Sequence, residues 1–202
     1  ADAIFIFGQN PGTNHPRMLG ELRAAYQRGA RIASFNPLRE RGLERFADPQ
    51  SKLEMATFGS TPISTHYFQL RVGGDLAAVK GIMKHVLEQE EAHGGVLDHA
   101  FIAQHTTGLD ALVASLQAES WAVLEEESGL SEAQMRAAGG VYIGADRVIA
   151  CWGMGITQHK HAVHTVQAIV SLLLLRGNIG RPGAGPCPVR GHSNVQGDRT
   201  MG

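Results

Sequence analysis

Short hydrophobic runs alternate along the chain with glycine-bearing polar turns and with longer stretches of helical spacing. Residues 3–7 form an uninterrupted apolar run that ends at Gly8, a pattern typical of a strand buried on both faces of a parallel sheet. A helix is predicted over about 16–28, and a second strand over 30–35. The order strand, loop, helix, strand indicates an α/β fold.

The same order returns twice further along. A strand over 67–72 leads through two glycines to a long helix, for which Asp75 is the expected N-cap. Capping-box spacing at Thr107 and at Ser131 predicts helices that begin just after each of them. The remaining expected elements are helices over about 109–118, 120–127 and 132–139, a strand over 147–152 and an apolar helix that ends near 176.

These elements predict a Rossmann-like three-layer domain with a mainly parallel sheet and helices on both faces. We expect one domain over 1–202, with an irregular insertion at about 36–65 and a cofactor-wrapping C-terminal segment at about 177–202. Because the chain enters a strand directly at Ala1, we expect it to be a piece of a larger subunit.

Composition narrows the class of protein. The chain has 202 residues, 43% of them hydrophobic, and a formal net charge of -1, so a basic surface for nucleic acid is not expected. The longest apolar run is too short to span a bilayer. Cys151 and Cys187 form no CxxC pattern, so neither a zinc nor an iron–sulfur site is expected here, and two lone thiols favour the cytoplasm.

Three glycine-bearing turns follow predicted strands, at 8–14, 73–75 and 153–158. In a parallel sheet such turns lie at the same edge, and the helix N-termini after them favour phosphate groups. None has the GxGxxG fingerprint of NAD domains or the GxxxxGK[ST] sequence of P-loops. Together they predict a large, nucleotide-like ligand, although any one of them alone would be an ordinary connection.

The C-terminal run from Gly177 to Gly197 carries many glycines and prolines around Arg190 and several amides. Glycine permits positive φ angles and close approach of the backbone, and proline stiffens the path. We therefore expect this run to wrap a ligand, with a long surface loop as the alternative.

Three segments carry a resemblance to a known family: 7–16, 151–158 and 177–202. In them the chain resembles molybdopterin oxidoreductases of the dimethyl sulfoxide reductase superfamily, and among these the formate-dehydrogenase-like alpha subunits. The run from Pro188 to Gly202 is most similar to their YdeP-type branch.

The resemblance implies that the domain helps to bind bis-molybdopterin guanine dinucleotide carrying molybdenum or tungsten. Asn36 and Leu38 replace two residues of the Asp-Pro-Arg turn that the family often has, so a carboxylate for the nucleoside is missing at that point. The residues that match cofactor-binding positions are Gly8, Asn10, Thr13, Asn14, Asn36, Pro37, Gly73, Asp75, Gly153, Met154, Gly155, Gln158, Asn194 and Gln196.

Arg190 matches the arginine that orients the substrate carboxylate near the metal in formate dehydrogenases, and its planar fork of donors suits that role. His192 stands where the formate enzymes have glutamine, which puts formate in doubt as the substrate. No residue of the chain matches the family's metal ligand, and a 4Fe-4S cluster is expected only outside it.

The leading hypothesis is a cofactor-binding domain of a molybdenum or tungsten oxidoreductase that performs two-electron chemistry on a small substrate. The expected partners are the other domains of the same alpha subunit and electron-transfer subunits, with no nucleic acid and no membrane. Two alternatives stay open: a nicotinamide-dinucleotide domain of an unrelated dehydrogenase, and a Rossmann-like scaffold that binds proteins.

Overall fold

A parallel five-stranded sheet forms the centre of the chain, which a computed structural model describes over residues 1–191. The strand order is β5-β2-β1-β6-β7, so the predicted first strand lies at the centre of the sheet. Every neighbouring pair is parallel. The strands are β1 (Ala3–Phe7), β2 (Arg31–Phe35), β5 (His66–Phe68), β6 (Val148–Trp152) and β7 (Gly185–Pro188).

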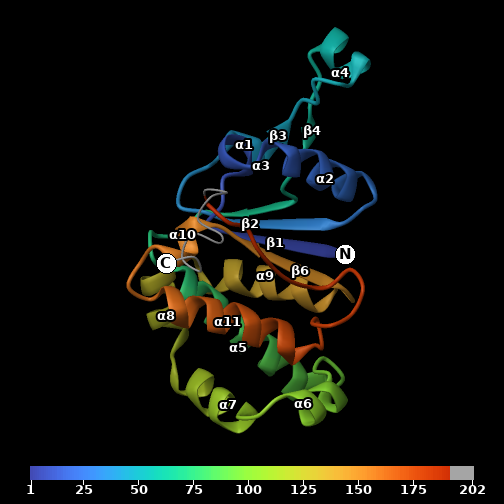
Figure 1. Cartoon of the computed structure of the whole chain (residues 1–202). Coiled ribbons are helices and arrows are strands. Elements are labelled where there is room, and N and C mark those ends of the chain that lie inside the picture. Colours follow the sequence, from blue (N-terminus) through green and yellow to red (C-terminus); the bar gives the residue numbers. More distant parts are fainter. Residues whose placement is uncertain (192–202) are drawn as a thin grey trace, which may run out of the picture.

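Helices cover both faces of this sheet, which confirms the predicted α/β three-layer fold (Figure 1). On one face α2 (Pro16–Gln27) packs over a small core that contains Ile4, Ile6 and Cys151. The other face carries the larger core, under α5 (Asp75–His93), α9 (Glu132–Ile143) and α11 (Ala162–Leu175). Alternate residues of the strands supply the two cores, as the pleat requires.

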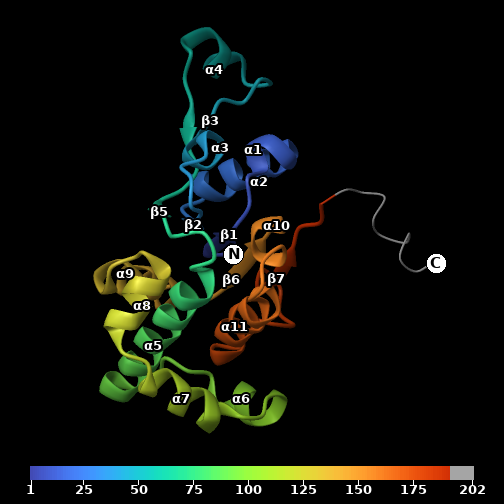
Figure 2. The same ribbon diagram turned by 90° about the vertical axis from the view of Figure 1, so that its left-hand side faces the viewer.

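Three further helices complete this side of the molecule: two lie beyond α5, away from the sheet, and the third lies beside α5 and α9 (Figure 2). They are α6 (His99–His105), α7 (Leu109–Ala118) and α8 (Trp121–Ser128). The sequence predicted the second and third of these but missed α6, which is short and begins at the N-cap Asp98. No helix within residues 1–191 has both the length and the hydrophobicity that a bilayer crossing needs.

The capping predictions were partly right. Ser131 and Gln134 form the expected reciprocal capping box at α9, which continues to Ile143 rather than ending near 139. Thr107 does not cap α7, because Gly108 with a φ of 83° is the N-cap. Asp75 is likewise inside the first turn of α5, since Gly74 is the N-cap and no side chain caps that helix.

The strand predicted over 67–72 ends early, at Phe68. Beyond it the chain turns toward the end of α8, where the Arg71 N–H donates to the Ser128 carbonyl at 2.8 Å. This contact takes the backbone out of the sheet and leaves Val72 87% exposed.

The insertion at 36–65 contains more order than its irregular sequence indicated. It holds α3 (Arg41–Glu44), α4 (Lys52–Thr57) and an antiparallel pair of short strands, β3 (Arg45–Phe46) and β4 (Thr61–Pro62). Figure 1 shows α4 projecting from the body on these strands. Arg23 of α2 anchors the projection through ion pairs to Asp48 at 3.2 Å and Glu54 at 2.7 Å.

The segment after α11 adds the edge strand β7, which the sequence did not predict. Pro186 and Pro188 belong to it, which agrees with its edge position, because proline cannot donate a hydrogen bond to a neighbouring strand. The Asn178 side-chain oxygen accepts from the Val148 N–H at 3.0 Å and ties the start of this segment to β6. The predicted wrapping segment therefore begins as part of the sheet.

Candidate functional site

Two glycine turns meet back to back where β1 and β6 end. Gly155 donates its N–H to the Gly8 carbonyl at 3.1 Å, and Gly153 donates to the Phe7 carbonyl at 3.2 Å. A Cβ atom on Gly155 would lie 2.7 Å from the Gly8 oxygen, a distance that real Cβ atoms do not tolerate. Gly8 itself has a φ of 52°, which favours glycine. Glycine at these positions is therefore required for the two turns to touch.

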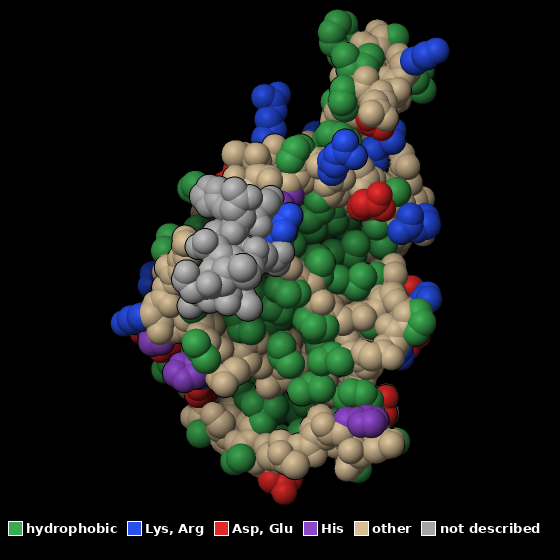
Figure 3. Space-filling view, viewed as in Figure 1, with side chains coloured by type: hydrophobic (Ala, Val, Ile, Leu, Met, Phe, Trp, Pro, Cys, Tyr) green, Lys and Arg blue, Asp and Glu red, His purple; other side chains and the backbone are tan. Residues whose placement is uncertain are grey.

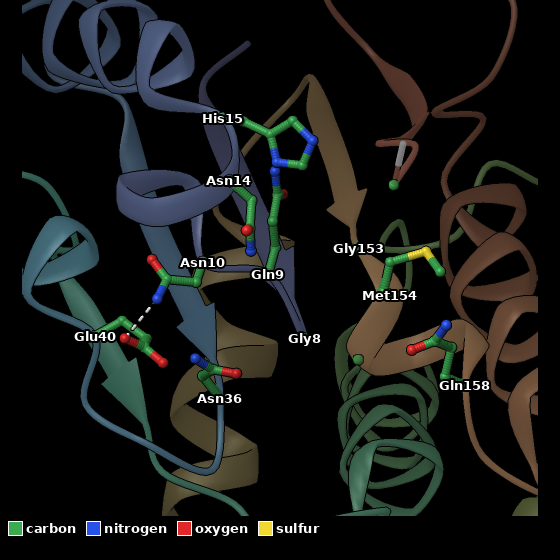
Figure 4. A pocket seen from close by; sticks show the side chains of 12 residues that line it. Gly8, Gln9, Asn10, Asn14, His15, Asn36, Glu40, Gly153, Met154 and Gln158 are labelled. Atoms are coloured by element: carbon green, nitrogen blue, oxygen red, sulfur yellow. Dashed lines mark hydrogen bonds between the residues drawn. The ribbon is translucent and has the colours of Figure 1, made fainter. Parts of the chain in front are cut away.

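A cavity of about 530 Å³ opens over these turns (Figure 4). It lies at the carboxyl ends of the strands, the edge at which parallel α/β sheets bind ligands. Two short helices, α1 (Pro11–Asn14) and α10 (Met154–Thr157), begin beside it. The lining residues are Gly8, Gln9, Asn10, Asn14, His15, Asn36, Glu40, Gly153, Met154, Gly155, Gln158 and Gly191.

The structure thus brings together eight of the residues expected to bind a cofactor: Gly8, Asn10, Asn14, Asn36, Gly153, Met154, Gly155 and Gln158. In Figure 4, Asn10, Asn36 and Glu40 lie on one side of the cavity, and Met154 and Gln158 lie on the other. Thr13 lines an adjoining hollow of about 310 Å³, which shares Asn10 and Glu40 with the cavity.

Two lining side chains hold hydrogen-bond acceptors with no partner. Gln9 is only 4% exposed; its amide nitrogen contacts the Met18 sulfur at 3.2 Å, but its oxygen Oε1 is unsatisfied. His15 donates from Nε2 to the Arg190 carbonyl at 2.9 Å, which leaves Nδ1 as a buried acceptor without a donor. Leaving such an atom unpaired costs about 1 to 3 kcal/mol, so both positions favour a ligand that carries N–H or O–H groups.

Glu40 is a lining residue that the sequence analysis missed. Its carboxylate accepts from the Asn10 amide at 2.6 Å, and its backbone N–H donates to the Tyr67 hydroxyl at 2.9 Å. It places an acidic group in the same cavity as Asn36, the residue that replaces the aspartate expected from the family resemblance. Glu40 comes four residues later in an irregular segment, so no spacing pattern could have identified it.

Gly73 and Asp75 do not line this cavity. Asp75 is only 4% exposed, and its oxygen Oδ1 has no hydrogen-bond partner. Burial raises the pKa of this carboxyl to about 6, even though it sits at the N-terminus of α5. Pro37 also lies away from the lining, and its carbonyl accepts from the Gln69 amide at 2.9 Å. The glycine turn at 73–75 therefore differs from the other two, because its acidic side chain is buried outside the cavity rather than lining it.

Arg190 is exposed and lies next to Gly191 in the cavity lining. His15 holds its carbonyl, and the preceding N–H, that of Val189, donates to the Trp152 carbonyl at 2.8 Å. The backbone at Arg190 is therefore fixed to both the β1 turn and the end of β6. His192, Asn194 and Gln196 lie outside the described residues.

No group of three or more potential metal-ligating side chains occurs within the part of the chain that the structure describes. The cavity instead offers carboxylate, amide and imidazole acceptors together with backbone N–H groups.

Comparison with known proteins decides the family. Residues 1–201 match the family model for molybdopterin oxidoreductases. The chain belongs to the molybdopterin oxidoreductase family. Aligned over the whole of this chain, the sequence is 50% identical to protein YdeP of Escherichia coli strain K12 and 32% identical to formate dehydrogenase H of the same organism. The chain covers 27% of the first protein and 25% of the second, so it spans about a quarter of the length of these relatives.

Among solved structures, acetylene hydratase from Pelobacter acetylenicus superimposes with a TM-score of 0.73 over 90% of this chain and 22% of that one. The sequence identity is 17%, so this likeness bears on the fold alone. It agrees with the parallel α/β arrangement described above.

Membership in the molybdopterin oxidoreductase family implies a molybdopterin cofactor with molybdenum or tungsten. The cavity fits such a group, because a pterin and a guanine both carry ring N–H and amino donors that suit the unsatisfied oxygen of Gln9 and nitrogen of His15. The glycine contact between the β1 and β6 turns also leaves backbone, rather than side chains, facing the ligand.

Proposed function

We propose that this chain forms one wall of the binding site for a bis-molybdopterin guanine dinucleotide in a molybdenum or tungsten oxidoreductase. The full-length protein would catalyse two-electron oxidation or reduction of a small substrate, and we expect it to work in the cytoplasm. The observation that carries the proposal is the pair of buried acceptors, on Gln9 and His15, over the joined glycine turns.

The bound cofactor would supply the redox-active metal and the ligand sulfurs around it. This chain's own residues would bind and orient that cofactor. Asn10, Asn36 and Glu40 form a polar side of the cavity that suits the nucleoside and its ribose hydroxyls. In particular, Glu40 would provide the carboxylate that Asn36 lacks.

On the opposite side, the β6 turn would contact the pterin. Gly153, Met154, Gly155 and Gln158 present backbone and one amide there. Thr13, beside the adjoining hollow, would approach the pyrophosphate or ribose, and Arg41 and Arg45 line the same hollow. Pro37, Gly73 and Asp75 stay as proposed contacts on the nucleoside side. Asn194 and Gln196 stay as proposed cofactor-binding residues.

Arg190 and His192 are the proposed catalytic residues. Arg190 would orient an anionic substrate through charge-assisted hydrogen bonds, and its backbone is already fixed beside the cavity by His15. The metal ligand, and any iron–sulfur cluster, would come from other parts of the subunit.

The surface also supports contact with further domains of the same subunit. Ten of the fourteen residues of helix α11 are apolar, and one of them, Val163, is 68% exposed. Figure 3 shows hydrophobic side chains gathered over this side of the molecule. A contiguous hydrophobic patch on a surface is normally a contact site, and about three quarters of each relative's length lies outside the matched region.

The test is cofactor analysis of the full-length protein. We expect molybdenum or tungsten together with two guanine nucleotides per metal after acid release. Nicotinamide nucleotide without either metal would support the dinucleotide-domain alternative and contradict the proposal. Absence of both would support the protein-binding scaffold.

A pair of glutamate variants tests this wall directly. Glu40→Gln removes the carboxylate charge in the cavity, and we expect it to lower guanine content while the protein stays folded. Glu44→Gln is the matched control, because Glu44 lies outside the cavity and pairs with Arg39 at 2.7 Å. Equal cofactor content in both variants would remove Glu40 from the site.

A further inference from the structure

Cys151 and Cys187, which the cofactor site does not use, are brought side by side by the unpredicted strand β7. They are direct partners in the parallel register of β6 and β7. Adjacent strands lie about 4.8 Å apart, and a disulfide spans Cα atoms about 4.4 to 6.8 Å apart. Because register partners point to the same face of a sheet, the two side chains can meet without a change of fold.

The two thiols differ in surroundings. Cys151 is 3% exposed and packs in the core beneath α2, whereas Cys187 is exposed on the edge strand. The Cys151 thiol donates a hydrogen bond to Cys187, which lowers the pKa of Cys187. The same hydrogen bond, and then burial, raise the pKa of Cys151. Cys187 thus carries more thiolate at neutral pH than an ordinary cysteine.

We propose that Cys187 and Cys151 form a peroxide-responsive thiol pair, in which exposed Cys187 is the nucleophile and buried Cys151 resolves it. The Cys187 thiolate attacks one oxygen of a hydroperoxide, the O–O bond breaks, and an alcohol or water leaves as sulfenic acid forms. The Cys151 sulfur then attacks the Cys187 sulfur. The S–O bond breaks, the hydroxyl group leaves as water with the proton of the Cys151 thiol, and the S–S bond closes. Over the two steps the thiol pair loses two electrons, both of which reduced the peroxide in the first step.

The pair also lies close to the cofactor cavity. Cys151 precedes the Gly153 turn by two residues, and Cys187 precedes Arg190 by three. A disulfide would covalently join the strands that carry these two segments. The proposal concerns thiol chemistry alone and stands whether or not the cofactor proposal is correct.

The experiment treats the full-length, metal-loaded protein with hydrogen peroxide, blocks remaining thiols and maps the peptides by mass spectrometry. We expect a cross-linked peptide containing residues 151 and 187, two hydrogens lighter than the sum of its parts and cleaved by a reductant. In Cys187→Ser, a mild change at an exposed position, Cys151 should stay reduced. Unlinked cysteines in the wild type, or equal oxidation of Cys151 in Cys187→Ser, would overturn the proposal.

Two substitutions of Cys151 distinguish its role as a hydrogen-bond donor to Cys187 from its role in forming the disulfide. Cys151→Ser keeps a donor, so Cys187 should be trapped as a sulfenic acid and should keep its alkylation rate. Cys151→Ala removes the donor, and alkylation of Cys187 at pH 6.5 should slow by about threefold or more, since thiolate fraction sets the rate. An unchanged rate in Cys151→Ala would refute activation by Cys151, and the wild-type mapping does not depend on either variant folding.

Discussion

The turn after β1 and the turn before α5 arise from the same sequence pattern, a strand followed by glycine and a helix start. Their polar side chains nevertheless lie in different surroundings. At the first, Gln9 lines the cavity with an unsatisfied oxygen. At the second, Asp75 is buried outside the lining, also with an unsatisfied oxygen. The pattern therefore determines the turn, while the packing of neighbouring helices determines what the turn faces.

The largest expected effect is on protein stability and comes from the buried carboxyl of Asp75, in the turn before α5. Burial raises the pKa of Asp75 to about 6, from 3.8 in an unfolded chain. The folded state therefore binds more protons between these values, and its stability falls as pH rises from about 4 to 6. With 1.36 kcal/mol for each pKa unit, the loss is about 3 kcal/mol. Asp75→Asn should remove this pH-dependent loss of stability. In protein purified without cofactor, the variant should therefore be more stable than wild type at pH 7.5.

The measurement is the difference in unfolding midpoint between variant and wild type at pH 4.5 and pH 7.5. Asp110→Asn is the control, since Asp110 is exposed in the first turn of α7. A ligand donor reaching Asp75 would shrink the pH effect in the cofactor-loaded protein. A difference between variant and wild type that stays constant across this pH range would show that Asp75 is not a strained buried acid.

The next largest effect is expected at the cavity, where the turns after β1 and β6 touch. Gly155→Ala would place a Cβ atom 2.7 Å from the Gly8 carbonyl oxygen, and the two turns would have to separate. Overpacking of this kind costs about 1 to 3 kcal/mol. We expect faster hydrogen exchange in residues 3–7 and 148–152, together with loss of bound cofactor.

Gly20→Ala provides the matched control for that change. Gly20 lies within α2 with nothing near its Cβ position, so alanine should stabilise the helix by up to about 1 kcal/mol. Equal exchange in the two variants would mean that the contact between the β1 and β6 turns does not hold this edge together.

Several parts of this molecule could be predicted from sequence because local patterns specify them. The apolar runs of β1, β2 and β6 and the capping box of Ser131 are examples. β7 could not be predicted, because its residues Gly185–Pro188 have no strand propensity and pair only because β6 offers an open edge.

The candidate site likewise contains residues that local patterns predict and residues whose positions depend on contacts distant in sequence. Gly8, Asn10 and Gly155 could be proposed from the strand–turn–helix pattern and the family resemblance, and they do line one cavity. Glu40 could not, because its position depends on the Tyr67 hydroxyl and the Asn10 amide, which are distant in sequence. Nor did the pattern show that Asp75, with the same kind of turn before it, would be enclosed.

The smallest expected effect separates the role of a helix cap from that of a ligand contact. Asn10 caps α1 by accepting from the Thr13 N–H at 3.2 Å, and Ser131 caps α9 far from the cavity by accepting from the Gln134 N–H at 3.3 Å. Replacing either with alanine should cost about 1 kcal/mol through the lost cap. Only Asn10→Ala also frees the Glu40 carboxylate inside the cavity, so it alone should lower the guanine content of the full-length protein. If both variants lose the same amount of guanine nucleotide, the loss reflects general destabilisation, and the polar side formed by Asn10 and Glu40 does not bind the nucleoside.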